Sequence, residues 1–85
     1  MTVQFTIHGQ NRAKKRQITE QMICTTLNKL NPKELIGYKA YIIDNSLSYI
    51  LVANIFRNRI KVITIMTDKG CFNVTGKNSI VRSVN

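Results

Sequence analysis

Three side chains near the start of the chain are spaced to do chemistry on a phosphate group. His8, Arg12 and Arg16 follow one another at intervals of four residues, so on a helix they form a row, with Lys15 beside them. Histidine titrates near neutral pH and serves as an acid or a base, while a guanidinium stabilises charge on phosphate oxygens. This row therefore predicts phosphodiester chemistry.

The same row has structural interpretations that the sequence leaves open. Basic runs on short helices are usually solvated, and a lone histidine more often hydrogen-bonds a loop carbonyl. Arg12 and Arg16 would then pair with Asp44 or Glu34 and join the helix to a sheet.

A second basic cluster, Arg57, Arg59 and Lys61, lies on a predicted hairpin tip and on the strand that leaves it. With Lys14, Lys15 and the two arginines of the first row, it would frame one cationic groove for a nucleic-acid backbone. The alternative is surface charge without a defined site.

Hydroxyl-bearing side chains add further candidates. Tyr38, Tyr41 and Tyr49 are candidates for base stacking or proton transfer, and Thr64 and Thr67 for binding phosphate near a strand end. Tyr38 or Thr64 would be the second proton carrier beside the histidine. Strand tyrosines more commonly pack at the edge of the core, and strand propensity explains the two threonines equally well.

Composition narrows the class of protein. The 85 residues include 13 Lys and Arg against 4 Asp and Glu, a net charge of +9, which favours a polyanionic partner. The 44% hydrophobic content is too high for a disordered basic tail, and no apolar run reaches the roughly 18 residues of a membrane span. The four acidic residues and the glycines are scattered, which predicts no metal site, no cofactor and no phosphate loop.

The two cysteines, Cys24 and Cys71, do not form a disulfide framework or a zinc motif. We expect free thiols, buried or half-buried, as in a reducing compartment. No secretory signal is visible, so we expect a cytoplasmic protein, or one delivered into the cytoplasm of a target cell.

The pattern along the chain predicts one domain over residues 1–85, of class α+β, with two N-terminal helices packed on a three- to five-stranded antiparallel sheet. An extended lead-in at Val3–Ile7 precedes a basic helix at His8–Arg16. A second helix begins at the N-cap Thr19 and ends at the Asn31-Pro32 step. The predicted strands are Tyr38–Ile43, Leu47–Phe56, Arg59–Thr67, Cys71–Thr75 and, as an edge strand or loose tail, Ser79–Val84.

The opening of the chain resembles a small bacterial and phage domain of unknown function. That domain begins His-Ala-x-x-Arg-Met-x-x-Arg-x-Ile-Ser, and the matching residues here are Phe5-Thr-x-His8-Gly-x-x-Arg12-Ala-x-x-Arg16-x-Ile18-Thr19. The likeness covers about residues 4–68, with residues 69–85 as a C-terminal extension. The domain is grouped with BrnT-like and RelE-like toxins, in the barnase–EndoU–colicin–RelE set of ribonucleases. The resemblance points to His8, Arg12 and Arg16 as functional residues.

We therefore predict a metal-independent ribonuclease toxin in which an RNA 2′-OH attacks the adjacent phosphate. His8 would be the acid or base, and an acidic antitoxin or immunity protein would cover the groove. The alternative is a non-enzymatic phage- or plasmid-encoded protein that binds nucleic acid or a host macromolecular machine. The sequence does not determine the oligomeric state.

Overall fold

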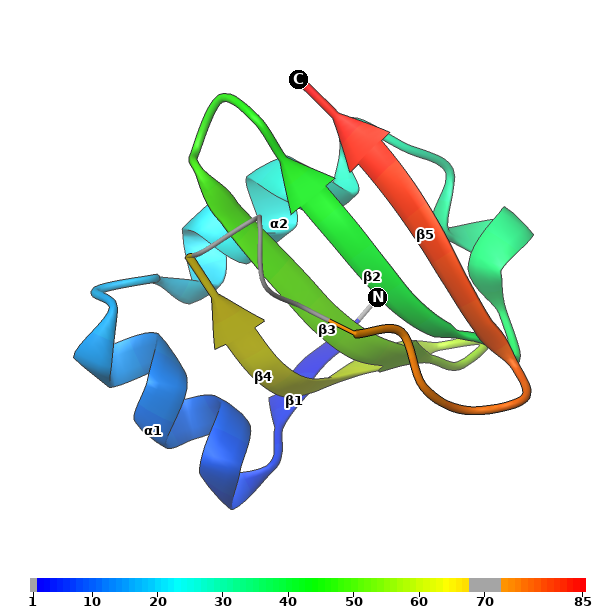
Figure 1. The fold of residues 1–85 in the computed structure, drawn as a ribbon, viewed down its shortest axis with the longest axis horizontal. Helices are drawn as coiled ribbons and strands as arrows, with labels where there is room; N and C mark the ends of the chain where they lie inside the picture. The colour runs from blue at the N-terminus through cyan, green and yellow to red at the C-terminus, as the bar shows by residue number, and fades with distance from the viewer. Residues whose placement is uncertain (1, 68–72) are drawn as a thin grey trace.

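A five-stranded mixed sheet carries the fold in the computed structural model, which describes residues 2–67 and 73–85. The strand order is β1-β4-β3-β2-β5, and α2 lies behind the sheet in the view of Figure 1, with α1 beside β4. In chain order the elements are β1 (Thr2–Phe5), α1 (Ile7–Lys15), α2 (Glu20–Leu27), the 3-10 helix η1 (Pro32–Leu35), β2 (Lys39–Asp44), β3 (Tyr49–Ile55), β4 (Arg59–Met66) and β5 (Ser79–Val84).

The predicted α+β class, with two helices on a sheet, is confirmed, but the prediction of a wholly antiparallel sheet is wrong. β2, β3 and β4 form antiparallel hairpins, whereas β1 pairs parallel with β4 and β5 pairs parallel with β2. A short turn in a sequence predicts that the two strands it connects are antiparallel neighbours. Parallel pairs instead join strands that lie far apart in the chain. The strand over Ser79–Val84 is confirmed as an edge strand. Of the predicted turn at 68–70 and strand at 71–75, residues 68–72 lie outside the described residues, and 73–75 form no strand.

Both helices begin at a threonine. The Thr6 hydroxyl accepts a hydrogen bond from the Gly9 N–H at 2.9 Å, and that of Thr19 accepts one from Met22 N–H at 3.1 Å, so the N-cap predicted at Thr19 is confirmed. α2 ends at Leu27, earlier than predicted. Pro32 instead opens η1, because proline suits the first turn of a helix, where no backbone donor is needed.

The two faces of the sheet differ in what covers them. The helix-covered face packs against α2 and η1 through a cluster of buried apolar residues: Ala13, Ile23, Leu27, Leu35, Ala40, Ile42, Tyr49, Leu51, Ala53, Ile55, Ile60, Val62 and Ile65. On the opposite face, which we call the second face, Tyr41, Ile50 and Val52 form a smaller cluster at one end. Figure 1 views the sheet from the second face.

α1 lies against the edge of β4, beyond the point where β1 ends. Thr6 N–H donates to the Val62 carbonyl at 3.0 Å, and Gly9 and Ala13 are the buried residues of the helix. A Cβ at Gly9 would lie closer to the Val62 carbonyl oxygen than real Cβ atoms come, and 3.1 Å from the Val62 carbonyl carbon. Glycine at position 9 therefore sets how closely α1 approaches the sheet.

We expect Gly9→Ala to destabilise the fold by about 2 kcal/mol, although alanine is the better helix former, because the clash is with backbone that cannot rotate away. Urea unfolding measures the change. Gln10→Ala, at an exposed position of the same helix, is the control and should alter stability by less than about 0.5 kcal/mol. A Gly9→Ala protein as stable as the wild type would contradict the packing described here.

Candidate functional site

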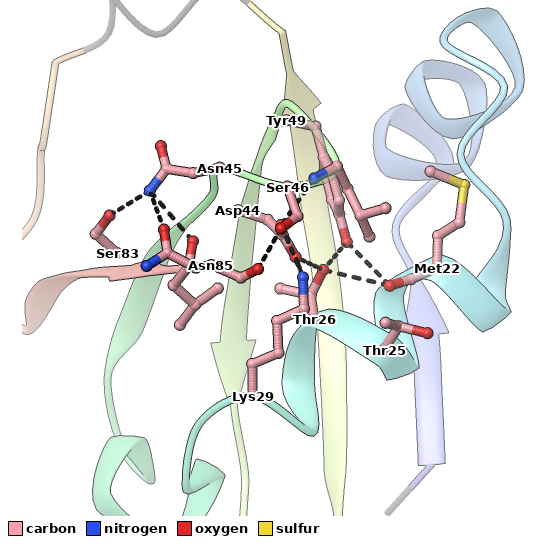
Figure 2. A network of polar contacts seen from close by, with 12 residues as sticks. Met22, Thr25, Thr26, Lys29, Asp44, Asn45, Ser46, Tyr49, Ser83 and Asn85 are labelled. Carbon is pink, nitrogen blue, oxygen red and sulfur yellow. Dashed lines mark hydrogen bonds and ion pairs between the residues drawn. The ribbon is translucent and has the colours of Figure 1, made fainter.

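The most conspicuous polar cluster is buried beneath α2 and centres on Asp44, whose side chain is 0% exposed (Figure 2). Lys29 Nζ donates to both carboxylate oxygens at 2.9 and 3.0 Å, and the Leu47 N–H donates to Oδ1 at 2.9 Å. The Thr26 hydroxyl donates to Oδ2 at 2.7 Å and is also hydrogen-bonded with the hydroxyl of Tyr49. These bonds use all four acceptor positions of the carboxylate, so none is left for a ligand.

The pKa values of Asp44 and Tyr49 in this cluster are shifted away from neutral pH. Burial would raise the pKa of Asp44, but hydrogen bonds from Leu47, Lys29 and Thr26, with the charge of Lys29, hold the pKa below its ordinary value. Burial raises the pKa of Tyr49 to about 12. The cluster therefore joins α2 to β2 and β3 and is poorly suited to acid–base work. It also rules out the alternative in which Arg12 or Arg16 pairs with Asp44, because Lys29 takes that place.

We expect Asp44→Asn to lower the free energy of unfolding by about 2 kcal/mol at pH 7, because the ion pair is lost while the shape is kept. The lowered pKa means that the unfolded chain binds a proton more readily in acid. The stability from Asp44 is thus complete above the unfolded pKa of about 4 and is lost as pH falls through the folded-state pKa.

Thermal unfolding between pH 7 and pH 2.5 tests this expectation, with Glu34→Gln at an exposed carboxylate as the control. Wild type and Glu34→Gln should lose stability in acid more steeply than Asp44→Asn. Parallel curves for all three proteins would contradict the role assigned to Asp44.

The second face carries a polar row that runs straight across all five strands. Register places Lys39 opposite Asn54, Asn54 opposite Lys61, Lys61 beside Gln4, and Lys39 beside Ser79. Directly paired residues point to the same side of a sheet, and adjacent strands are about 4.8 Å apart. The two lysines are therefore held about 10 Å apart at the backbone, with an amide between them.

A second row at the end of the sheet adds an aromatic ring. Phe56 N–H donates to the Arg59 carbonyl at 2.9 Å, and the Arg59 guanidinium lies over the Phe56 ring, 4.5 Å from its centroid. Thr2 pairs with Arg59 on β1, and Arg57 is exposed in the turn between β3 and β4. We call these two rows, together with Arg57, the basic rows.

Among the described residues, no carboxylate forms an ion pair with a cation of the basic rows, since the ion pair of the described chain joins Asp44 to Lys29. Glu20 begins α2, Glu34 lies in η1, and Asp44 is buried on the helix-covered face. Lys61 and Arg59 are exposed, while Lys39 is half-buried with its ammonium 5.4 Å from the centre of the Tyr41 ring. Arg59 and Lys61 are thus exposed to an anionic partner, whereas the segment before β5 covers the face beside Lys39, where the Thr75 N–H donates to the Tyr41 hydroxyl at 3.4 Å.

The predicted His8–Arg12–Arg16 row is divided by the structure. Arg16 Nε donates to the Ile65 carbonyl at 3.2 Å, and a terminal guanidinium nitrogen donates to the Thr67 hydroxyl at 2.7 Å, so Arg16 joins α1 to the edge of β4. α1 runs in the same direction as β4 (Figure 1), and Gly9 faces that edge. The geometry of a right-handed helix therefore places His8 and Arg12 on the side of α1 next to the second face. His8 is exposed and Arg12 is half-buried.

Other predicted site residues are dispersed. Thr64 is half-buried on the second face of β4, whereas Tyr38 precedes β2, two strands away from β4. Lys15 lies beside His8 on the same side of α1, whereas Lys14 lies on the far side of that helix. The structure therefore brings His8, Arg12 and Thr64 to one side of the sheet and leaves Tyr38 apart from them.

Two tyrosines considered for base stacking are unsuited to it, because Tyr41 is 4% exposed and Tyr49 is 0% exposed. Burial would raise the pKa of Tyr41, but the hydrogen bond and charge of Lys39, together with the hydrogen bonds of Thr75, bring the pKa below its ordinary value.

Sequence reasoning missed Lys39, Asn54 and Phe56 as parts of a site. The alternation of Lys39 with buried Ala40 was the available signal, since it places Lys39 and Tyr41 on one face.

A pocket of about 250 Å³ lies between α2 and the start of β1 and β4. Mostly apolar residues line it, with Cys24 among them: Val3, Cys24, Leu27, Asn28, Leu30, Pro32 and Ile60. Cys24 is a free thiol as predicted, but it is exposed rather than buried or half-buried. Cys71 lies outside the described residues.

Within residues 2–67 and 73–85, no three His, Cys, Asp or Glu side chains gather in a way that would hold a metal ion. No helix in the same ranges is long and apolar enough to cross a membrane. A scan of protein-family models and searches of curated proteins and of solved structures find no match. The toxin-like resemblance of residues 4–68 therefore stays a prediction.

Proposed function

We propose that the protein binds RNA through the basic rows of the second face. The observation that carries this proposal is the register of the sheet, which sets Lys39, Asn54 and Lys61 in one line with Arg59 in the next. Rigid strands fix the spacing of the cations, so less backbone conformational entropy is lost on binding than with the same charges on a flexible tail.

The polar composition of the rows also suits RNA. Lysine and arginine bind phosphate, and the amides of Asn54 and Gln4 are able to donate to and accept from a 2′-OH. The Ser79 hydroxyl donates its proton to the Thr75 carbonyl and is able only to accept. Because no described carboxylate is ion-paired with a cation of the basic rows, no such pair has to be broken when RNA binds. Affinity should consequently fall steeply with salt, as counterions are released from the phosphates.

We expect Lys61→Gln to weaken RNA binding about fivefold at 0.1 M salt and to reduce the slope of log K against log salt by about one. Lys33→Gln, which removes the same charge from η1, is the matched control and should bind almost as the wild type does. Fluorescence anisotropy with an end-labelled RNA measures both. Equal losses in the two variants would mean that net charge alone, and not the basic rows, drives binding.

A ribonuclease is the second candidate, favoured by the placement of His8 and Arg12 on the side of α1 next to the second face. In this reaction the 2′-oxygen bonds to phosphorus and its proton passes to His8. The bond from phosphorus to the 5′-oxygen breaks as that oxygen takes a proton from water, which leaves a 2′,3′-cyclic phosphate. Arg12 would stabilise the charge on the non-bridging oxygens, and Lys61 would hold the RNA backbone. An acidic antitoxin or immunity protein would bind the same cations and block the reaction.

For this candidate, His8→Ala should slow cleavage about 10²- to 10⁴-fold in the presence of EDTA, because the proton carrier is lost. Its RNA affinity should stay within about twofold of wild type, since the basic rows are intact. Gel analysis of end-labelled RNA follows the reaction, with Gln10→Ala as a control on the same helix. Equal cleavage by wild type and His8→Ala, or no cleavage by either, would remove His8 from a catalytic role.

A further inference from the structure

We infer that the basic rows select single-stranded over duplex RNA, by stacking one unpaired base on Phe56. This inference rests on the proposed function, because it names the form of RNA that the same surface takes. It depends on the Phe56 ring in the second of the basic rows, because a surface that bound only phosphates would need no aromatic side chain.

Phe56 is 38% exposed, although it lies directly after a strand that is buried almost throughout. Its ring is held by the Arg59 guanidinium, 4.5 Å from the centroid, and its backbone N–H by the Arg59 carbonyl. The ring is therefore fixed among cations instead of being packed in the core. Aromatic rings and guanidinium planes of this kind stack on bases, at about 1–3 kcal/mol per base.

A base can reach this ring only when it is unpaired. In an A-form duplex the bases are stacked on one another, and the major groove is too deep and narrow for side chains to read. On a single strand the phosphates would follow Lys61 and Lys39 while one base turns toward Phe56. Asn54, between the two lysines, lies within one row of Phe56 and presents an amide to the edge of a neighbouring base.

The Phe56–Arg59 pair also has a purely structural explanation, as a contact that stabilises the β3–β4 hairpin. Two substitutions separate the roles. Phe56→Tyr keeps a ring that is able to stack, whereas Phe56→Leu keeps apolar bulk but removes the ring. If the Phe56–Arg59 pair is only a hairpin contact, Phe56→Leu changes thermal stability. If the ring stacks on a base, Phe56→Leu lowers RNA affinity while thermal stability stays the same.

The experiment measures anisotropy with a 12-nucleotide RNA that has no self-complementarity and with the blunt duplex formed from the same strand. Wild type should bind the single strand at least tenfold more tightly than the duplex. Phe56→Leu should lose about tenfold on the single strand and less than twofold on the duplex, and Phe56→Tyr should bind as wild type. Thermal unfolding of each variant is recorded alongside.

Equal affinity of wild type for the two RNAs would overturn the inference, as would a Phe56→Leu protein that binds the single strand normally. Both outcomes leave the proposed function standing as long as Lys61→Gln still weakens binding. Absence of binding to either RNA, or Lys61→Gln and Lys33→Gln losing affinity equally, would instead overturn the proposed function.

Discussion

Hydrogen bonds to the carbonyls at the edge of β4 arrange the molecule around the candidate site. β1 covers the edge only as far as Val62. Beyond that point, Thr6 and Arg16 donate to the carbonyls of β4, so α1 takes the place of a longer strand. Because Gly9 allows the close approach, the exposed side of α1 borders the second face.

Two groups of charged residues have different roles. The ion pair of Asp44 with Lys29 is buried and fully hydrogen-bonded, which makes it a structural link between α2 and the β2–β3 hairpin. A polar connection also ties that hairpin to the C-terminus, where Asn45 donates to Ser83 and to the Val84 carbonyl (Figure 2). The cations of the basic rows keep their charge available for a partner.

Local signals predicted much of the fold. The N-cap at Thr19 and the hairpins of β2, β3 and β4 depend on residues close together in the chain, so their propensities are readable from short windows. The parallel edge strands were missed because the residues that pair across them are distant in sequence. Arg59 and Lys61 were found as a cluster because they are close together in the sequence. Lys39 was not assigned to that cluster, because only the registers of β2 on β3 and of β3 on β4 bring it into the row of Lys61.

The sequence by itself determined the excess of cations, the α+β class and the helix that carries His8 and Arg12, because composition and helical periodicity are local properties. Tertiary structure decided which of those charges act together. It turned Arg16 toward the carbonyl edge of β4, buried Asp44 with Lys29, and aligned Lys39 with Lys61. The physical reason is that strand register and the satisfaction of backbone and buried polar groups are set by the whole sheet, and no single segment encodes them.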